Sequence, residues 1–203
     1  MKSIVIDVHA HFTPKLMSER FEVNAAKFPD VKLVKSDKGV TLQFPGTAPT
    51  RPIMPGLSDL AGRQAWMDKA GIDHQVVGGW LDSFGYELPA AQGAAWSRYL
   101  NDCMWEQFRD ERRFSALATV PLQDGKLAAE VLAEAMERGF AGVMVGTLNA
   151  TGDVTSWARV GGNSGTAGAL PITTVFDLSV GPDGFLYAAT HGRGIWRTPV
   201  STL

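Results

Sequence analysis

Two histidines separated by one residue, His9 and His11, stand directly after the apolar run IVIDV near the start of the chain. Neutral imidazole is the commonest protein ligand for metals, and alternate residues of a β-strand project from the same face. A strand that reaches these positions would therefore aim both rings at one point. A divalent metal held there, with zinc as the expected ion, would activate a bound water near neutral pH.

Two histidines are an incomplete ligand set, because a catalytic zinc normally has three protein ligands and one water. The only other histidines are His74 and His191. His74 precedes a predicted strand, so we expect a surface histidine at the opposite end of the sheet, and His191 falls in a predicted turn. The missing ligands would come from carboxylates such as Asp7 or Asp82, or from a partner chain.

The elements that must position the pair follow an alternating pattern as far as about residue 147. Strands are expected near residues 3–8, 73–78, 114–120 and 140–146, helices near 58–70, 89–112 and 125–138, and a hairpin at 31–44. Alternation of strands and helices is typical of βα units around a parallel sheet. Four strands make half of an eight-stranded barrel or a small open sheet, and barrel enzymes place catalytic groups where strands end.

The composition changes after Thr147. Of the 40 charged residues only six lie beyond it, whereas nine of the 22 glycines do. Short β segments separated by turns at 181–184 and 191–194 predict a small antiparallel meander over residues 154–199. The sequence thus favours an α/β half barrel at residues 1–149, followed by a β tail at 150–203.

The first segment resembles the amidohydrolase superfamily, in the branch similar to aminocarboxymuconate-semialdehyde decarboxylase. The resemblance covers residues 3–149 and is carried by IDVHAHFTPK, RQAWMDKAGIDHQVV, YLNDCMWEQFRDERRFSALATVPLQD and AMERGFAGVMVGT. It implies a zinc-dependent (β/α)₈ barrel that decarboxylates or hydrolyses small, often aromatic, acids. His9 and His11 would be its first-strand metal ligands. The family takes a third histidine ligand from strand five, a catalytic histidine from strand six and an aspartate ligand from strand eight, and this chain leaves the pattern after strand four.

The tail carries a second resemblance. VFDLSVGPDGFLYAATHGRGIWRTPV, within residues 154–199, is similar to the closing blade of a β-propeller made of neuraminidase-like (BNR) repeats. Such propellers have several blades, so one blade leaves apolar faces without neighbours. Half a barrel likewise has two open edges, and we expect self-association.

Overall composition limits the classes of partner. The formal charge of −2 predicts no binding to nucleic acid or an anionic membrane. The single cysteine, Cys103, cannot form an internal disulfide and is expected to be a small buried helix residue. No apolar run reaches the length of a membrane span, and these features together predict a cytoplasmic protein.

Three functions stay open. The first is a metal-dependent hydrolase or decarboxylase that acts on a small carboxylated substrate, with Arg51 as a candidate for binding the carboxylate and no catalytic residue assigned. The second is a catalytically inactive truncated or fused remnant. The third is a binding module that uses tail aromatics, namely Trp157, Tyr187 and Trp196.

Overall fold

The structure is a computed structural model of the 203-residue chain. It describes residues 4–146, 175–180, 183–190 and 194–199. The chain divides into two compact units, Met1–Asp153 and Val154–Leu203, and each is described by itself. The predicted domain boundary at 149/150 and the first part of the predicted meander lie outside the described residues.

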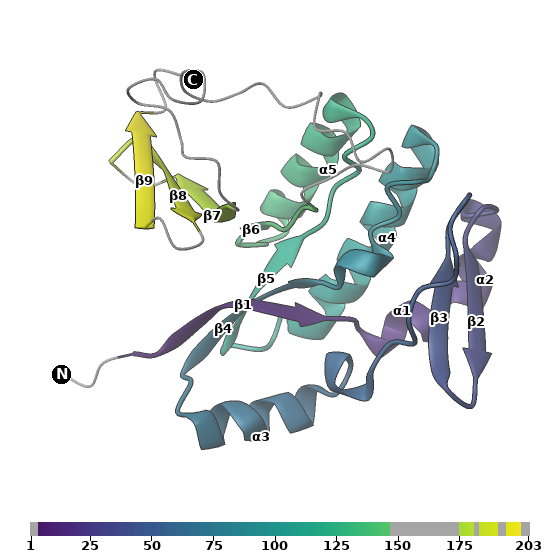
Figure 1. The fold of residues 1–203 in the computed structure, drawn as a ribbon, viewed down its shortest axis with the longest axis horizontal. Helices are drawn as coiled ribbons and strands as arrows, with labels where there is room; N and C mark the ends of the chain where they lie inside the picture. Colours follow the sequence, from purple (N-terminus) through teal and green to yellow (C-terminus); the bar gives the residue numbers. More distant parts are fainter. Residues whose placement is uncertain (1–3, 147–174, 181–182, 191–193, 200–203) are drawn as a thin grey trace. The chain divides into compact units, whose positions relative to one another are not determined.

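Four parallel strands form the sheet of the first unit, in the order β1-β4-β5-β6. They are β1 (Ile6–Phe12), β4 (His74–Gly79), β5 (Phe114–Ala118) and β6 (Gly142–Val143). Within this sheet, neighbouring strands also follow one another along the chain. The connection between each two neighbours contains a helix, as βα units require (Figure 1). The predicted half barrel or open parallel sheet is confirmed, and the described strands close no barrel.

Strands β1 and β6 differ most from the predicted ranges, whereas β4 is shifted by one residue and β5 ends two residues early. Strand β1 was expected at 3–8 but runs from Ile6 to Phe12, so the strand itself carries His9 and His11. Ala10 and Phe12 are buried in the core and extend the strand beyond the apolar run. Strand β6 was expected at 140–146 but is limited to Gly142–Val143, because its ladder with β5 has only two residue pairs.

Two of the three longer helices between the described strands begin after an aspartate that caps them, Asp59 in one and Asp124 in the other. Helix α3 (Leu60–Ala70) has Asp59 as its N-cap and Gly71, with a φ of 69°, as its C-cap. The Asp59 carboxylate accepts from the Gly62 amide, whereas the hydroxyl of Ser58, the predicted N-cap, donates to the Thr13 carbonyl. Helix α4 (Ala90–Phe108) ends four residues before the predicted end. Helix α5 (Gly125–Glu137) agrees closely with the prediction.

A second layer of short elements covers one side of α4. It contains α1 (Lys15–Glu19), α2 (Phe21–Asn24), η1 (Ala25–Lys27), the antiparallel hairpin β2 (Lys32–Ser36) and β3 (Gly39–Gln43), and the turns η2 (Pro55–Leu57) and η3 (Leu81–Ser83). Its apolar side chains form a core around Trp96 of α4, which is fully buried. The indole of Trp96 donates to the Ser83 carbonyl at 2.7 Å, which satisfies its polar atom. The predicted hairpin and the buried Cys103 are confirmed.

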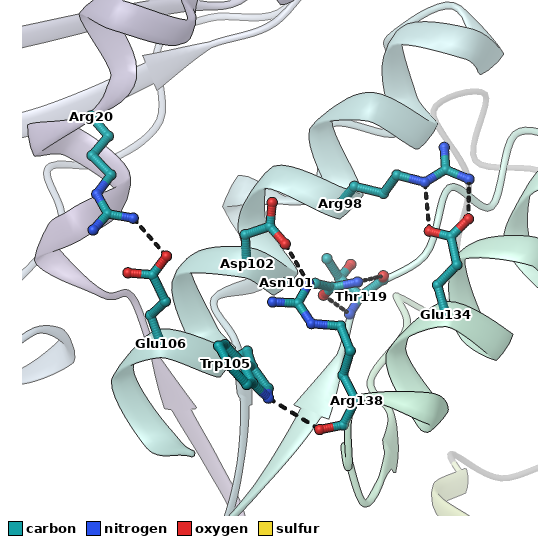
Figure 2. A network of polar contacts seen from close by, with 9 residues as sticks. All are labelled: Arg20, Arg98, Asn101, Asp102, Trp105, Glu106, Thr119, Glu134 and Arg138. Atoms are coloured by element: carbon teal, nitrogen blue, oxygen red, sulfur yellow. Dashed lines mark hydrogen bonds and ion pairs between the residues drawn. The ribbon is translucent and has the colours of Figure 1, made fainter. Parts of the chain in front are cut away.

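Polar contacts attach α4 to three other parts of the unit (Figure 2). Asn101, which is buried, donates to the Thr119 carbonyl at 2.9 Å and accepts from the Thr119 amide at 2.8 Å. Arg98 makes two bonds of 2.7 Å with Glu134 of α5, and Glu106 pairs with Arg20 at 2.8 Å. These contacts hold the segment after β5 and the flanking helices against α4.

The second unit contains three antiparallel strands, β7 (Val175–Val180), β8 (Phe185–Thr190) and β9 (Gly194–Pro199). The strands pair in sequence order, so the predicted meander is present in the described part of the tail. Gly184 has a φ of 76°, which is the conformation expected at the end of the first turn. The likeness to a propeller blade stays a prediction. In the described part of the chain, no helix has the length and apolar character of a membrane span.

Candidate metal centre

The two faces of the sheet differ in what covers them. Ala10, Phe12 and Val77 are buried together with Met67 of α3 and Met104 of α4, and we call this the helix-covered face. We call the opposite face the open face. His11 alternates with Ala10 and Phe12 and is half-buried on the open face, at the C-terminal end of β1.

His9 and His11 lie close enough to bind the same metal ion. Their ring centroids are 4.9 Å apart and the ring planes meet at 87°. Two imidazoles bound to one tetrahedral zinc, with Zn–N distances of about 2.0–2.1 Å, have ring centroids about 5 Å apart. His9 is exposed, so its ring is free of packing on the side toward solvent. The spacing of the pair therefore fits a divalent metal.

The main chain fixes the tautomer of His11. Its Nδ1 lies 2.8 Å from the carbonyl oxygen of Gly79, the last residue of β4. A carbonyl can only accept a hydrogen bond, so in the neutral ring Nδ1 carries the proton and Nε2 has the lone pair. Histidines that bind metals usually donate their second ring N–H to such an acceptor, which orients the ring and raises its basicity. The chemistry of the donor set thus agrees with its geometry.

A β-bulge removes Asp7 from the open face. Asp7 is in register with Gln75 and Ala10 with Val77, so β1 has one extra residue between these two pairs. Gln75 and Val77 share the helix-covered face, and Asp7 therefore lies there as well. Strict alternation would have put Asp7 beside the histidines, and its expected role as a third ligand is wrong. Among the described residues, no group of three or more His, Cys, Asp or Glu side chains could hold a metal.

The other candidate ligands are engaged elsewhere. His74 pairs with Ile6 and stands four residues before Gly78, the partner of His11, which is about 13 Å along the strand. The predicted position at the opposite end of the sheet is confirmed. His74 is half-buried, however, rather than a surface residue, because its Nε2 lies 2.8 Å from the Ser115 hydroxyl. His191 and Trp157 lie outside the described residues.

Arg51 lies beside the segment that follows β4. Its guanidinium is 3.2 Å from the Asp82 carboxylate in η3, and its Cζ is 6.0 Å from the ring centroid of Trp80. Both partners follow the C-terminal end of β4, which is the end of the sheet that carries His11. The Arg51 side chain is 79% exposed. This contact occupies Asp82, the other carboxylate considered as a ligand.

Met144 covers part of the open face next to His11. A Cβ atom at Gly78 would lie 2.5 Å from the Met144 sulfur, so the thioether rests directly on the glycine. Gly78 is the register partner of His11. A small cavity below the strand ends, lined by Thr13, Gly79 and Thr119, has a volume of about 10 Å³, room for about one water. This cavity is too small for an organic acid.

Comparison with known structures identifies the architecture. The chain matches 5-carboxyvanillate decarboxylase LigW from Sphingomonas paucimobilis at 20% identity with a TM-score of 0.52, over 73% of this chain and 44% of that one. It matches the IDCase of Metarhizium anisopliae at 16% identity and a TM-score of 0.53, over 72% and 43%. An amidohydrolase from Mycobacterium avium subsp. paratuberculosis matches at 18% identity and 0.53, over 71% and 50%.

These similarities establish the fold. The expected likeness to amidohydrolase-type decarboxylases is confirmed for its architecture, and the chain spans half or less of each of these relatives. No protein family matches the sequence, and no curated protein is similar to it. Among the described residues, the structure adds two polar side chains behind β1 that the sequence patterns did not single out, the half-buried Arg63 and the buried Gln75, which form a hydrogen-bonded chain with Asp7. Helix α3 buries only Met67, so its sequence pattern did not mark Arg63 as part of this group.

Proposed function

We propose that this chain is one part of a metal-dependent decarboxylase or hydrolase that acts on a small carboxylated substrate. The observation that carries the proposal is the His9–His11 pair at the C-terminal end of a parallel strand, with the His11 tautomer fixed by Gly79. This end of a parallel sheet is where barrel enzymes bind their substrates. Two ligands are too few for tight binding, so further ligands must come from outside the described residues.

The proposed roles of the chain's own residues follow from their positions. His9 and His11 would hold the metal. Zinc is the proposed ion because it binds imidazole nitrogen well and does not change its oxidation state. Bound there, a divalent cation would polarise a carboxylate oxygen or lower the pKa of a bound water. The Nδ1–H of His11 would donate to the Gly79 carbonyl, so that Nε2 is the nitrogen that binds the metal.

Arg51 is the proposed group for the substrate carboxylate. Its guanidinium is mostly exposed and reaches the C-terminal end of β4 through a single exposed ion pair with Asp82. Such a pair contributes less than about 1 kcal/mol, so a bidentate substrate carboxylate can replace Asp82 at small cost. Arg51→Lys keeps the charge but loses the planar fork, and should raise KM for 5-carboxyvanillate, the first substrate to test, more than it lowers kcat.

Metal binding is the direct test of the proposal. Calorimetric titration with Zn²⁺ should show binding by the wild type, because His9 and His11 are close enough to hold one ion. The variant with His9→Ala and His11→Ala should show none. His74→Ala is the matched control, since it removes an imidazole from the same sheet at the other end, and it should bind as the wild type does. Equal binding by the double variant and the wild type would contradict the proposal.

We also propose a second copy of the chain as the partner that completes the site. The four strands are parallel and in sequence order, and β1 and β6 are the two edges of the sheet among the described strands. A two-fold axis along the strands would place β1 of one copy beside β6 of the other at both junctions. Eight parallel strands would result, with four histidines at one mouth. The alternative, a catalytically inactive remnant, would bind metal weakly or not at all.

A further inference from the structure

The backbone of β1 is held from behind at the two metal-binding positions. The bulge between Asp7 and Ala10 takes this part of the strand out of register with β4. The Asp7 carboxylate accepts a hydrogen bond from the His9 amide at 3.2 Å. The Arg63 guanidinium donates to the His11 carbonyl at 2.7 Å. Each candidate ligand therefore has a main-chain atom bound by a side chain other than its own.

Gln75 links these two side chains. Its amide nitrogen donates to the other oxygen of Asp7 at 2.8 Å, and its amide oxygen accepts from Arg63 at 3.0 Å. Gln75 is 1% exposed, so neither end of its amide can exchange its partner for bulk water. The contacts form one continuous path from the His9 amide through Asp7, Gln75 and Arg63 to the His11 carbonyl.

Stability alone is a poor explanation for this arrangement. Arg63 is half-buried, its Nε has no hydrogen-bond partner, and its remaining contacts are a 3.2 Å bond to the Gly56 carbonyl and the face of Phe12. Burial lowers the pKa of the Arg63 guanidinium, and the charge of Asp7 opposes that effect. A buried polar group with an unsatisfied atom is costly compared with apolar packing, whereas it can specify one geometry.

We propose that Asp7, Gln75 and Arg63 are positioning residues that set the orientation of His9 and His11 toward a metal from the opposite face of the sheet. The inference rests on the proposed metal site and assigns its supporting residues. Acting through the main chain suits a bulged strand, because small backbone rotations at a bulge would re-aim the rings. Supporting contacts of this kind typically change metal affinity by about 10–100-fold.

The path offers a polarity swap as its test. Asp7→Asn alone can bring two amide nitrogens face to face, and Gln75→Glu alone brings two carboxylates together. When both substitutions are combined, the new amide at position 7 can donate to the new carboxylate at position 75. That carboxylate can still accept from Arg63, and the amide oxygen at position 7 can still accept from the His9 amide. Each single variant should weaken Zn²⁺ binding by about 10-fold or more, and the double variant should return to within about threefold of the wild type.

A matched arginine separates positioning from general stabilisation. Arg113 donates to the Ile72 carbonyl at 2.7 Å and to the Asp73 carbonyl at 3.3 Å, next to the opposite end of β4. Arg63→Met should lower Zn²⁺ affinity by about 10-fold or more and change the visible absorption of bound Co²⁺, which reports ligand geometry. Arg113→Met should lower the Tm but leave affinity and spectrum as in the wild type.

The outcomes distinguish this inference from the proposed function. Wild-type protein that binds no Zn²⁺ overturns the proposed function. The positioning claim is then decided in the metal-free protein, where nuclear Overhauser contacts between the His9 and His11 rings should disappear in Arg63→Met and persist in Arg113→Met. If the wild type binds Zn²⁺ and the single variants, corrected for folded fraction, bind within about threefold of it, the positioning claim is wrong.

Discussion

At the scale of single residues, Gly78 is required by the side chain that lies over it. A methyl group there would lie 2.5 Å from the Met144 sulfur and 2.9 Å from its Cβ atom. The flexible thioether can move, but its Cβ is fixed by the backbone, so part of the overlap must remain. Gly78 is the register partner of His11, so a change in the packing of Met144 on Gly78 would also affect the surroundings of the candidate site.

We expect Gly78→Ala to lower the free energy of unfolding by about 1–3 kcal/mol through overpacking. Urea denaturation measures the change. Gly125→Ala is the control, because nothing lies within 4 Å of a Cβ at that position, and it should change stability by less than about 0.5 kcal/mol. Adding Met144→Ala should reduce but not abolish the cost of Gly78→Ala in a double-mutant cycle, because it removes the sulfur overlap and keeps the Cβ overlap at 2.9 Å. Additive losses would contradict the assigned overlap.

The residues of the candidate site were predictable only in part. The two-residue period of a strand placed His9 and His11 on one face, and that part of the prediction needed no tertiary information. The same rule failed for Asp7, because the bulge adds one residue and the sequence IDVHAHF contains no glycine or proline to mark it. Arg63 and Gln75 escaped notice because their roles depend on contacts between three elements.

At the scale of elements, α4 holds the segment that follows β5. The Asn101 side chain forms hydrogen bonds with both the amide and the carbonyl of Thr119, as a paired strand would (Figure 2). Neither the pattern of apolar residues nor helix propensity predicts such a bond. The helix boundaries were nevertheless predictable at capping residues, with Gly71 as the clearest case.

Asn101→Ala should lower the free energy of unfolding by about 1–3 kcal/mol, because it leaves two buried backbone groups of Thr119 without partners. Hydrogen exchange of the Thr119 amide should accelerate in parallel. Asp102→Ala, at the next position of the same helix, removes an exposed ion pair with Arg138 and should cost less than about 1 kcal/mol. Equal losses in the two variants would contradict the assigned role.

Two carboxylates, Glu106 of α4 and Glu134 of α5, make the free energy of unfolding depend on pH in the acid range. Arg20 lowers the pKa of Glu106, and Arg98 lowers the pKa of Glu134, in each case chiefly through a direct hydrogen bond. A carboxylate that is more acidic in the folded state stabilises the protein above its ordinary pKa of about 4.5. That stability is lost as the pH falls through the folded-state pKa. Both groups are well exposed, so solvent screening keeps each contribution small.

We therefore expect the wild type to lose more stability between pH 6 and pH 3 than the Glu106→Gln, Glu134→Gln double variant, as measured by urea unfolding at each pH. Glu22→Gln is the control, because its contact with Lys35 is 3.5 Å long and its side chain is 81% exposed. It should follow the wild-type profile. A double variant with an unchanged slope would show that these ion pairs do not contribute.

At the scale of the whole molecule, the first unit exposes apolar residues along the β1 edge. Ile4, Ile6 and Val8 are 73%, 52% and 66% exposed, although each is a residue type that strands usually bury. Natural sheets protect their edges with charges, bulges or covering elements. Four parallel strands with such an edge could be predicted from the sequence. The element that covers this edge could not be predicted from the sequence. An open edge limits how a partner strand can pair with it, but it does not determine which strand that is.

The proposed two-fold pairing predicts a dimer with a shared metal. Sedimentation equilibrium of the wild type should show dimers, and Zn²⁺ should bind at one ion per two chains, because histidines from both copies would share one ion. Ile6→Lys with Val8→Lys should give monomers, since lysine on an edge strand opposes pairing. Val23→Lys with Val34→Lys is the control, because these residues are 88% and 54% exposed on α2 and β2. That variant should remain dimeric, and monomeric wild-type protein, or dimers that survive both lysines on β1, would rule out pairing through this edge.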